Sequence, residues 1–507
     1  MPGATPLRRV LVLIALGLLA GLAAAPARAQ GSASVLSYHN GGDRSGRYVV
    51  PGLTWARAAG LHRDAGFDGR VAGAVYAQPL YWRPAGAARG LVIVATEANR
   101  VVALDAATGS VAWETLLGPP VPGRALPCGN IDPLGITGTP AIDAASGTLY
   151  LDAMVMRQEG PRHLVFALAL GDGVVVPGWP VDVAAGLASR GMDFVPRLQN
   201  QRGALVLLGG RLFLPYGGHY GDCGAYHGWV VGIPLARPGD RPAVAAAWET
   251  RGTKGGIWAP GGIAAADGAL FVATGNTEVA RDWSDGEAVL RLGPDLAPPV
   301  PPRAAFAPAD WRQLDAADLD LAGANPMPVD LAGRRLILAL GKDGKAYLLD
   351  RDALGGIGGA LDAMPAASEP IRTGPASWTA PGGAFVAFAG AGASCPFGRG
   401  GAGLTVLRIA AAGRGGITTA WCAALDGAGS PVTTTSGGGT DRIVWIAGAE
   451  GDDRLHGFRA DTGAIVFAGG GPGDRMPGLR HFATILAAAG RLYIAGDDRV
   501  YAFAAGR

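Results

Sequence analysis

The chain has 507 residues, of which 17% are charged, and its formal net charge is +2. A nearly neutral chain without blocks of Lys or Arg is a poor partner for nucleic acid or for anionic lipid. The four cysteines are Cys128, Cys223, Cys395 and Cys422. None stands in a CxxC or CxxCH pattern, which argues against a zinc site, a redox dithiol or attached haem, and two disulfides in any of three pairings stay open.

The N-terminus has the pattern of a secretory signal peptide. Arg8 and Arg9 precede the apolar run "VLVLIALGLLAGLAAA", and Ala27-Arg28-Ala29 is a small-x-small cleavage site. The apolar run is too short and wrongly flanked for a stable membrane span. We therefore expect residues 1–29 to be a signal peptide cut near Ala29. The remaining chain is expected to be periplasmic or secreted, without a membrane span.

The rest of the chain repeats one phrase. "LVIVATEANRVVALDAATGSVAW" (91–113) is its fullest copy, 442–467 is a second, and "GRLYIAGDDRVYAFAAGR" (490–507) ends the chain with half a copy. Weaker copies begin at residues 147, 210, 268, 334 and 383, which gives eight units about 45 to 65 residues apart. Short β-rich runs bounded by Gly, Asp and Asn are typical of strands in antiparallel blades.

These repeats predict one all-β domain over residues 30–507, an eight-bladed β-propeller of four-stranded antiparallel blades. The glycine of each Thr-Gly turn supplies the positive φ that a tight hairpin needs. Because the last copy is truncated, we expect an N-terminal strand to complete the last blade and close the ring, which removes an exposed sheet edge. Either "SASVLSYH" (32–39) or the segment near Leu61–Val71 is expected to supply that strand.

The "ALDAATGSVAW" phrase resembles the repeat of the quinoprotein alcohol dehydrogenase-like propellers. That superfamily contains dehydrogenases that use pyrroloquinoline quinone (PQQ), and also non-catalytic propellers such as an outer-membrane assembly scaffold. The repeat alone is therefore evidence of fold, and function has to be argued from the site.

Two stretches resemble the cofactor-binding segments of the PQQ dehydrogenases. In "GGIWAPGGIAAADGALFVATGN" the resemblance makes Trp258 the indole under the quinone ring and Asn276 a calcium ligand. In "GKDGKAYLLDR" it makes Lys342 the basic residue that hydrogen-bonds the quinone oxygens. A flat indole suits a planar heterocycle, an amide oxygen suits a hard cation, and an ammonium stabilises charge that grows on the quinone.

Two further stretches supply carboxylates. "DAADLDL" (315–321) is similar to the family's Asp-x-Trp-Asp-x-Asp-Leu segment, which makes Asp318 the general base and a metal ligand beside Asp315 and Asp320. In "GGHYGDCGAYHGWVVGI" (217–233) the family expects a calcium-binding glutamate. Cys223 stands at the nominal position, so the adjacent Asp222 is the predicted, displaced ligand. An isolated Trp, Lys or acidic run of this kind is more often structural than functional.

The chain also departs from the family. Ala317 replaces the Trp of the acidic segment, the adjacent cysteine pair is missing, and "VYAQPL" has Tyr76 or a neighbour where the family has a glutamate. Two functions stay open. One is a PQQ- and Ca²⁺-dependent dehydrogenase of alcohols or sugars that passes electrons to a separate acceptor. The other is a non-catalytic propeller that binds an exported protein or a polymer. No nucleophile constellation supports a hydrolase or lyase on the same scaffold.

Overall fold

The fold is known from a computed structural model. It describes residues 1, 3 and 34–506, except 236–238, 240, 279, 280, 392–394, 396–401 and 412–415. The predicted signal peptide therefore lies almost wholly outside the described residues. Ser32–Arg507 forms one compact unit. Within the described part of the chain, no helix is long and apolar enough to cross a membrane.

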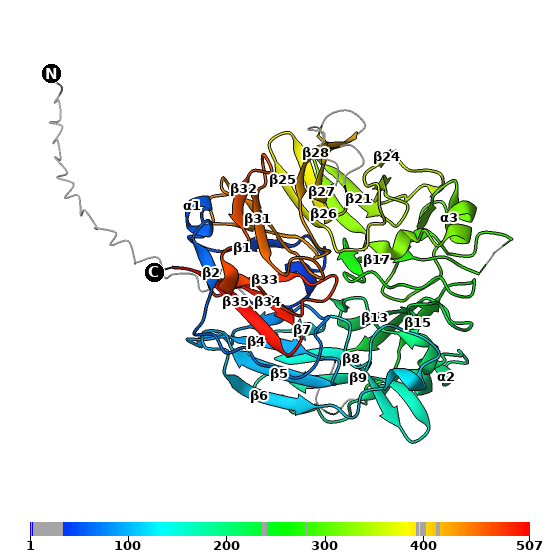
Figure 1. Cartoon of the computed structure of the whole chain (residues 1–507). Coiled ribbons are helices and arrows are strands. Elements are labelled where there is room, and N and C mark those ends of the chain that lie inside the picture. The colour runs from blue at the N-terminus through cyan, green and yellow to red at the C-terminus, as the bar shows by residue number, and fades with distance from the viewer. Residues whose placement is uncertain are drawn as a thin grey trace. The chain divides into compact units, whose positions relative to one another are not determined.

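The described residues form eight sheets that follow one another along the chain as the blades of a propeller, which confirms the predicted fold (Figure 1). Blade 1 contains β3 (Leu80–Trp82), β4 (Leu91–Ala95), β5 (Arg100–Asp105) and β6 (Val111–Leu116), and blade 2 contains β7 (Ala141–Asp143), β8 (Thr148–Arg157), β9 (Gly160–Ala169) and β10 (Val181–Asp182). Blade 3 contains β11 (Gln199–Asn200), β12 (Val206–Leu208), β13 (Arg211–Gly218), β14 (Trp229–Pro234) and β15 (Ala246–Glu249). Blade 4 contains β16 (Ala264–Ala266), β17 (Ala269–Thr274), β18 (Ala288–Leu292), β19 (Ala305–Ala307) and β23 (Gly356–Ile357).

Blade 5 contains β20 (Met327–Leu331), β21 (Arg334–Leu340), β22 (Lys345–Asp350) and β24 (Asp362–Pro365), and blade 6 contains β25 (Ala376–Ala380), β26 (Gly383–Ala389), β27 (Ala402–Ala410) and β28 (Ile417–Ala424). Blade 7 contains β1 (Arg47–Val49), β29 (Val432–Thr435), β30 (Ile443–Ala447), β31 (Leu455–Arg459) and β32 (Ile465–Ala468). Blade 8 contains β33 (Ile485–Ala488), β34 (Arg491–Gly496), β35 (Arg499–Ala505) and β2 (Leu61–Arg63). The helices are α1 (Trp55–Ala58), α2 (Val183–Ala188) and α3 (Trp311–Ala317).

An N-terminal strand closes the ring, as predicted. β2 pairs antiparallel with β35, with Leu61 opposite Ala505, so the second of the two expected segments supplies the closing strand. In Figure 1 the blue β2 lies beside the red β35. Two parallel strands were not predicted: β1 is added to β29 in blade 7, and β23 to β19 in blade 4. Each is only two or three residues long and has no repeat pattern of its own.

The Thr-Gly turns have a packing role besides their hairpin geometry. Gly463 has φ 71°, and a Cβ on it would lie 2.7 Å from the Trp421 ring of the preceding blade. Trp421 in turn donates from Nε1 to the Ala460 carbonyl oxygen of blade 7 at 3.0 Å. The bare glycine therefore lets the indole of one blade pack flat against the turn of the next. Trp113 and Gly173 make the same contact between blades 1 and 2.

The segment 34–46 lies across the first strands of several blades. Backbone hydrogen bonds join Val35 to Tyr81, Leu36 to Ile142, Gly42 to Ala265, Ser45 to Ser377 and Gly46 to Thr433. Arg44 is fully buried in this segment, and burial lowers its pKa to about 10. Its guanidinium donates to the carbonyl oxygens of Ile263 at 2.9 Å and Leu205 at 2.7 Å. The N-terminal segment is thus tied to blades 3 and 4 by one charged side chain.

Replacing Arg44 with Met should lower the free energy of unfolding by about 3 kcal/mol, because carbonyl oxygens buried against the guanidinium would lose their donors. Arg47→Met is the matched control. Arg47 pairs with Asp43 at the surface, where the two side chains are 48% and 35% exposed, and its loss should cost under about 1 kcal/mol. Urea unfolding measures both changes. Equal destabilisation by the two variants would contradict the role given to Arg44.

A buried ion pair of blade 2, His163 with Asp152, is hydrogen-bonded to blade 3. His163 Nδ1 lies 2.7 Å from Asp152 Oδ1, and Nε2 lies 3.0 Å from the Gln199 carbonyl oxygen. Both partners are acceptors, so both ring nitrogens donate and the ring is an imidazolium. Tyr216 Oη donates to the other oxygen of Asp152 at 2.9 Å. Burial opposes the charge, but Asp152 outweighs burial and raises the pKa of His163.

The stability that His163 contributes should therefore depend on pH. Its pKa is higher in the folded chain than in the unfolded chain, where it is about 6.5. The contribution is complete below that value and is lost as the pH rises through the folded-state pKa. The difference in unfolding free energy between the wild type and His163→Gln should accordingly be larger at pH 6 than at pH 9. A difference that does not change between these pH values would show that His163 is neutral in the folded chain.

Candidate axial-face site

The predicted site residues all lie on loops at one face of the propeller. Trp258 and Asp318 are on the connections that run from one blade to the first strand of the next, after β15 and β19. Asp222, Asn276 and Lys342 are on the loops that link the second and third strands of blades 3, 4 and 5. In an up-and-down blade these two kinds of loop emerge at the same face. We call it the axial face.

Asp320 joins the predicted pair Trp258 and Asn276. Its Oδ2 accepts from Trp258 Nε1 at 3.1 Å, and its Oδ1 accepts from the Asn276 backbone N–H at 2.9 Å. The backbone holds the two segments together, because Gly255 N donates to the Asn276 carbonyl oxygen at 2.7 Å. A Cβ on Gly275 would lie 3.0 Å from Asp320 Oδ1, so glycine leaves room for the carboxylate.

The three aspartates of the acidic segment have different environments. Asp315, in α3, accepts from Thr277 N at 2.5 Å. Asp318 ends α3 in the left-handed conformation, with φ 54°, and its side chain is 63% exposed. The Asp320 side chain is only 5% exposed. The segment thus points one carboxylate toward solvent and buries another two residues later.

Lys342 lies between these two carboxylates. Its Nζ is 2.8 Å from Asp318 Oδ1 and 2.6 Å from Asp320 Oδ2, and it lies 5.3 Å from the centre of the Trp258 ring. Burial disfavours the ammonium, but Asp320 and Asp318 outweigh burial and raise the pKa of Lys342. We refer to Trp258, Asn276, Asp318, Asp320 and Lys342 as the Asp320 cluster. The structure brings four of the five predicted site residues into it.

Asp222, the fifth predicted residue, is bonded to Tyr226 rather than to the cluster. Tyr226 Oη donates to Asp222 Oδ1 at 2.5 Å. Burial, then Asp222, then Asp320 and Asp318 raise the pKa of Tyr226, so the pair lies within electrostatic reach of the cluster. The neighbouring Cys223 forms a disulfide with Cys128, and the second disulfide joins Cys395 to Cys422. The first disulfide links the loop that contains Asp222 with the connection between blades 1 and 2.

Glu287 belongs to the same region and was missed in the sequence. It is fully buried, and its Oε2 accepts from Leu321 N at 2.7 Å. Burial and the nearby Asp320 raise its pKa well above that of an ordinary glutamate, which favours a neutral carboxylic acid. A single Glu ahead of a strand gives no sequence signal for this placement.

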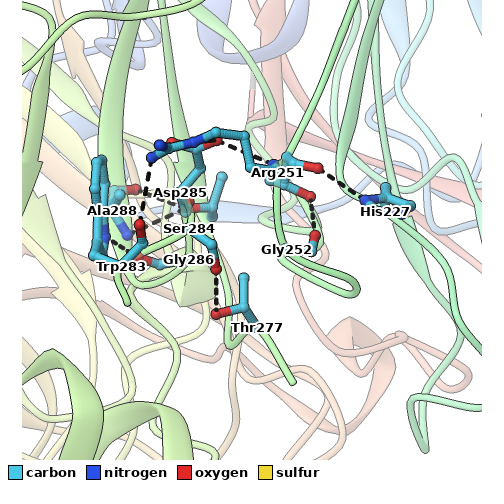
Figure 2. Close-up of polar contacts among 11 residues, drawn as sticks. His227, Arg251, Gly252, Thr277, Trp283, Ser284, Asp285, Gly286 and Ala288 are labelled. Carbon is cyan, nitrogen blue, oxygen red and sulfur yellow. Dashed lines mark hydrogen bonds and ion pairs between the residues drawn. The ribbon is translucent and has the colours of Figure 1, made fainter. Parts of the chain in front are cut away.

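An arginine–aspartate pair braces the loop between Asn276 and Glu287 (Figure 2). Arg251 donates from Nε and Nη2 to the two oxygens of Asp285, at 2.9 and 2.7 Å, and also from its backbone N–H at 3.1 Å. The Arg251 guanidinium also lies over the Trp283 ring, 5.3 Å from its centre. His227 Nδ1 lies 2.8 Å from the Thr250 carbonyl oxygen and so holds the end of β15 from the other side.

The metal ligands predicted from the sequence are Asp222, Asn276 and Asp318, and their joint coordination stays a prediction. No group of three or more His, Cys, Asp or Glu side chains able to hold a metal ion is found in the described part of the chain. The predicted set contains one amide, Asn276, and two carboxylates that are already hydrogen-bonded, Asp222 to Tyr226 and Asp318 to Lys342.

Comparison with solved structures gives the fold a known counterpart. The chain is similar to the quinohemoprotein alcohol dehydrogenase from Comamonas testosteroni (15% identity, 94% of this chain and 81% of that chain, TM-score 0.63). It is also similar to the quinohemoprotein alcohol dehydrogenase ADHIIG from Pseudomonas putida HK5 (13% identity, 93% of this chain and 80% of that chain, TM-score 0.61). A third similar structure is a europium-containing methanol dehydrogenase (13% identity, 91% of this chain and 89% of that chain, TM-score 0.61). No protein-family model and no curated protein matches the chain. The chain thus has the propeller fold of these dehydrogenases.

Proposed function

We propose that this protein is a periplasmic or secreted quinoprotein dehydrogenase, which uses PQQ and Ca²⁺ to oxidise an alcohol or a sugar. The observation that carries the proposal is the Asp320 cluster. Trp258, Asn276, Asp318 and Lys342 come from three separate sequence segments. Trp258, Asn276 and Lys342 contact the buried Asp320 carboxylate, and Asp318 joins them through Lys342. An indole, an ammonium and an exposed carboxylate at the axial face are the groups that such a reaction requires.

The residues of the axial face fit a polar, planar cofactor. Several buried polar atoms on the axial-face loops have no hydrogen-bond partner among the described residues, and buried polar atoms in folded proteins are normally paired. They are Gln201 Oε1, Arg202 Nε, Glu287 Oε1 and Asn325 Oδ1. A carbonyl or carboxylate group of a ligand would accept from Arg202 Nε, and N–H groups or a cation would pair with the amide and carboxylate oxygens. Trp258 is only half-buried, so its ring offers a surface for a planar group.

Each residue of the cluster has a defined task in this proposal. PQQ, when bound, would supply the two-electron acceptor for the substrate. Trp258 would contact the flat face of the cofactor, and Lys342 would donate to the quinone oxygens. Asn276, Asp318 and the nearby Asp222 would hold Ca²⁺. The exposed carboxylate of Asp318 would accept the hydroxyl proton of the substrate.

A buried Asp320 explains how the cluster keeps this geometry. Three N–H donors, from Trp258, Asn276 and Lys342, are bonded to the two carboxylate oxygens of Asp320. The indole and the ammonium are therefore fixed before any ligand arrives, which lowers the entropic cost of binding. Electrons would have to leave to a separate acceptor, because the sequence has no CxxCH motif for attached haem.

One observation favours a second function, a non-catalytic scaffold that binds an exported protein or a polymer. Both carboxylates predicted to bind the metal already have partners in the chain, Asp318 with Lys342 and Asp222 with Tyr226. In that case the axial face would keep the arrangement of a cofactor site without its chemistry.

Reconstitution separates the two functions. Chelator-treated protein would be loaded with PQQ and Ca²⁺, separately and together, and offered a panel of alcohols and aldoses with an artificial electron-accepting dye. The dehydrogenase proposal predicts dye reduction only when both are present. If no substrate in the panel reduces the dye, the scaffold function is favoured.

A further inference from the structure

A cavity of about 330 Å³ lies between blades 8 and 1. Its lining comes from the loop 83–90 that links β3 to β4, from residues 106 and 107 after β5, and from the turn 489–490 between β33 and β34. These loops link first to second strands and third to fourth strands, so they emerge at the face opposite the axial face. The cavity is therefore separate from the Asp320 cluster, and a ligand could bind there whether or not the protein is a dehydrogenase.

Three arginines, Arg83, Arg89 and Arg491, line this cavity, and the lining contains no Asp or Glu. The remaining lining side chains are mostly small or apolar, among them four alanines and Pro51. Small walls leave space for a ligand, and the arginines give that space a positive charge. We call this site the arginine cleft.

The charges of the arginine cleft are only partly balanced within the protein. Arg491 Nη2 lies 2.7 Å from Asp64 Oδ2, but Arg491 Nε is buried and has no hydrogen-bond partner among the described residues. Arg89 lies 3.7 Å from Asp105, and its side chain is 67% exposed.

Arg83 has no carboxylate partner at all in the described part of the chain. The three arginines thus have two carboxylate partners, Asp64 and Asp105, and one positive charge stays unpaired. An anion bound in the cleft would balance this charge.

From this arrangement we propose that the arginine cleft binds the oxyanion group, phosphate or carboxylate, of a small molecule. The planar fork of a guanidinium matches both groups in a bidentate manner. The cavity volume is at the lower end of the range for small-molecule sites, about 300–1,000 Å³. The occupant is accordingly no larger than a phosphorylated or carboxylated sugar.

Isothermal titration calorimetry on the mature protein tests this proposal. The probes are inorganic phosphate, glycerol 3-phosphate and succinate, and they distinguish a phosphate site from a carboxylate site. Saturable binding of at least one probe is expected, and both Arg83→Gln and Arg89→Gln should weaken it about tenfold. Arg89 is exposed, so its variant keeps the test valid if Arg83→Gln does not fold.

Arg408→Gln is the matched control for the loss of one positive charge. Arg408 lies in blade 6, away from the arginine cleft, and its guanidinium donates to the Gly382 carbonyl oxygen, so its variant should bind the probe as the wild type does. The proposal is overturned if none of the three probes binds up to tens of millimolar. It is equally overturned if binding is unchanged in Arg83→Gln and Arg89→Gln, or falls as much in Arg408→Gln.

Discussion

Asp318→Asn should lower the turnover of the reconstituted enzyme by roughly 10²–10⁴-fold, the range lost when a general base is removed. The amide keeps the size of the side chain but cannot accept the hydroxyl proton. The Asp318 side chain is 63% exposed and ends a helix, so the fold should tolerate the change. Dye-linked initial rates, measured after saturation with PQQ and Ca²⁺, give the comparison.

Asp310→Asn is the matched control for this prediction. Asp310 precedes α3 on the same connection, and it pairs with Lys345 at 2.7 Å rather than with the Asp320 cluster. Its variant should keep turnover within about twofold of the wild type. Wild-type turnover in Asp318→Asn would show that Asp318 is not the general base. An equal loss of turnover in Asp310→Asn would contradict that role as well.

Asp320→Ala should lower the free energy of unfolding by roughly 3–5 kcal/mol, as is usual when one partner of a buried charged pair is removed. The change leaves Trp258 Nε1 and the Asn276 N–H without their acceptor, and it leaves Lys342 with only the exposed Asp318. Urea unfolding, followed by tryptophan fluorescence, measures the loss.

Asp318→Ala is the comparison for stability, because Asp318 binds the same ammonium from an exposed position. Exposed ion pairs contribute about 0–1 kcal/mol, so this variant should unfold close to the wild type. If the two variants are equally destabilised, Asp320 does not anchor the cluster. If neither is destabilised, the buried carboxylate has no structural role.

The repeat predicted the fold because each copy carries the same strand–turn–strand pattern. For the closing strand β2 the sequence left two candidate segments. The truncated last copy shows that a strand is missing, but it does not show which residues supply that strand. β1 and β23 were not predicted, because each is very short and its partner lies far away in the sequence or across a loop.

The site was predicted only in part, for a physical reason that Asp318 and Asp320 illustrate. Motif spacing selected Trp258, Asn276 and Lys342, which the structure places together. Which of two nearby aspartates is buried depends on the left-handed residue that ends α3, and α3 was not predicted. Glu287 and the Cys128–Cys223 pairing depend on contacts between loops of different blades. No local pattern records such contacts.

The proposed function requires the axial face to bind a planar quinone cofactor against Trp258. Titration of the chelator-treated mature protein with PQQ, with and without Ca²⁺, tests it through the quenching of tryptophan fluorescence, with Trp258→Ala as the control. The account predicts saturable, Ca²⁺-dependent quenching that is lost in Trp258→Ala. Absence of binding at tens of micromolar PQQ, or identical binding by Trp258→Ala, would contradict it.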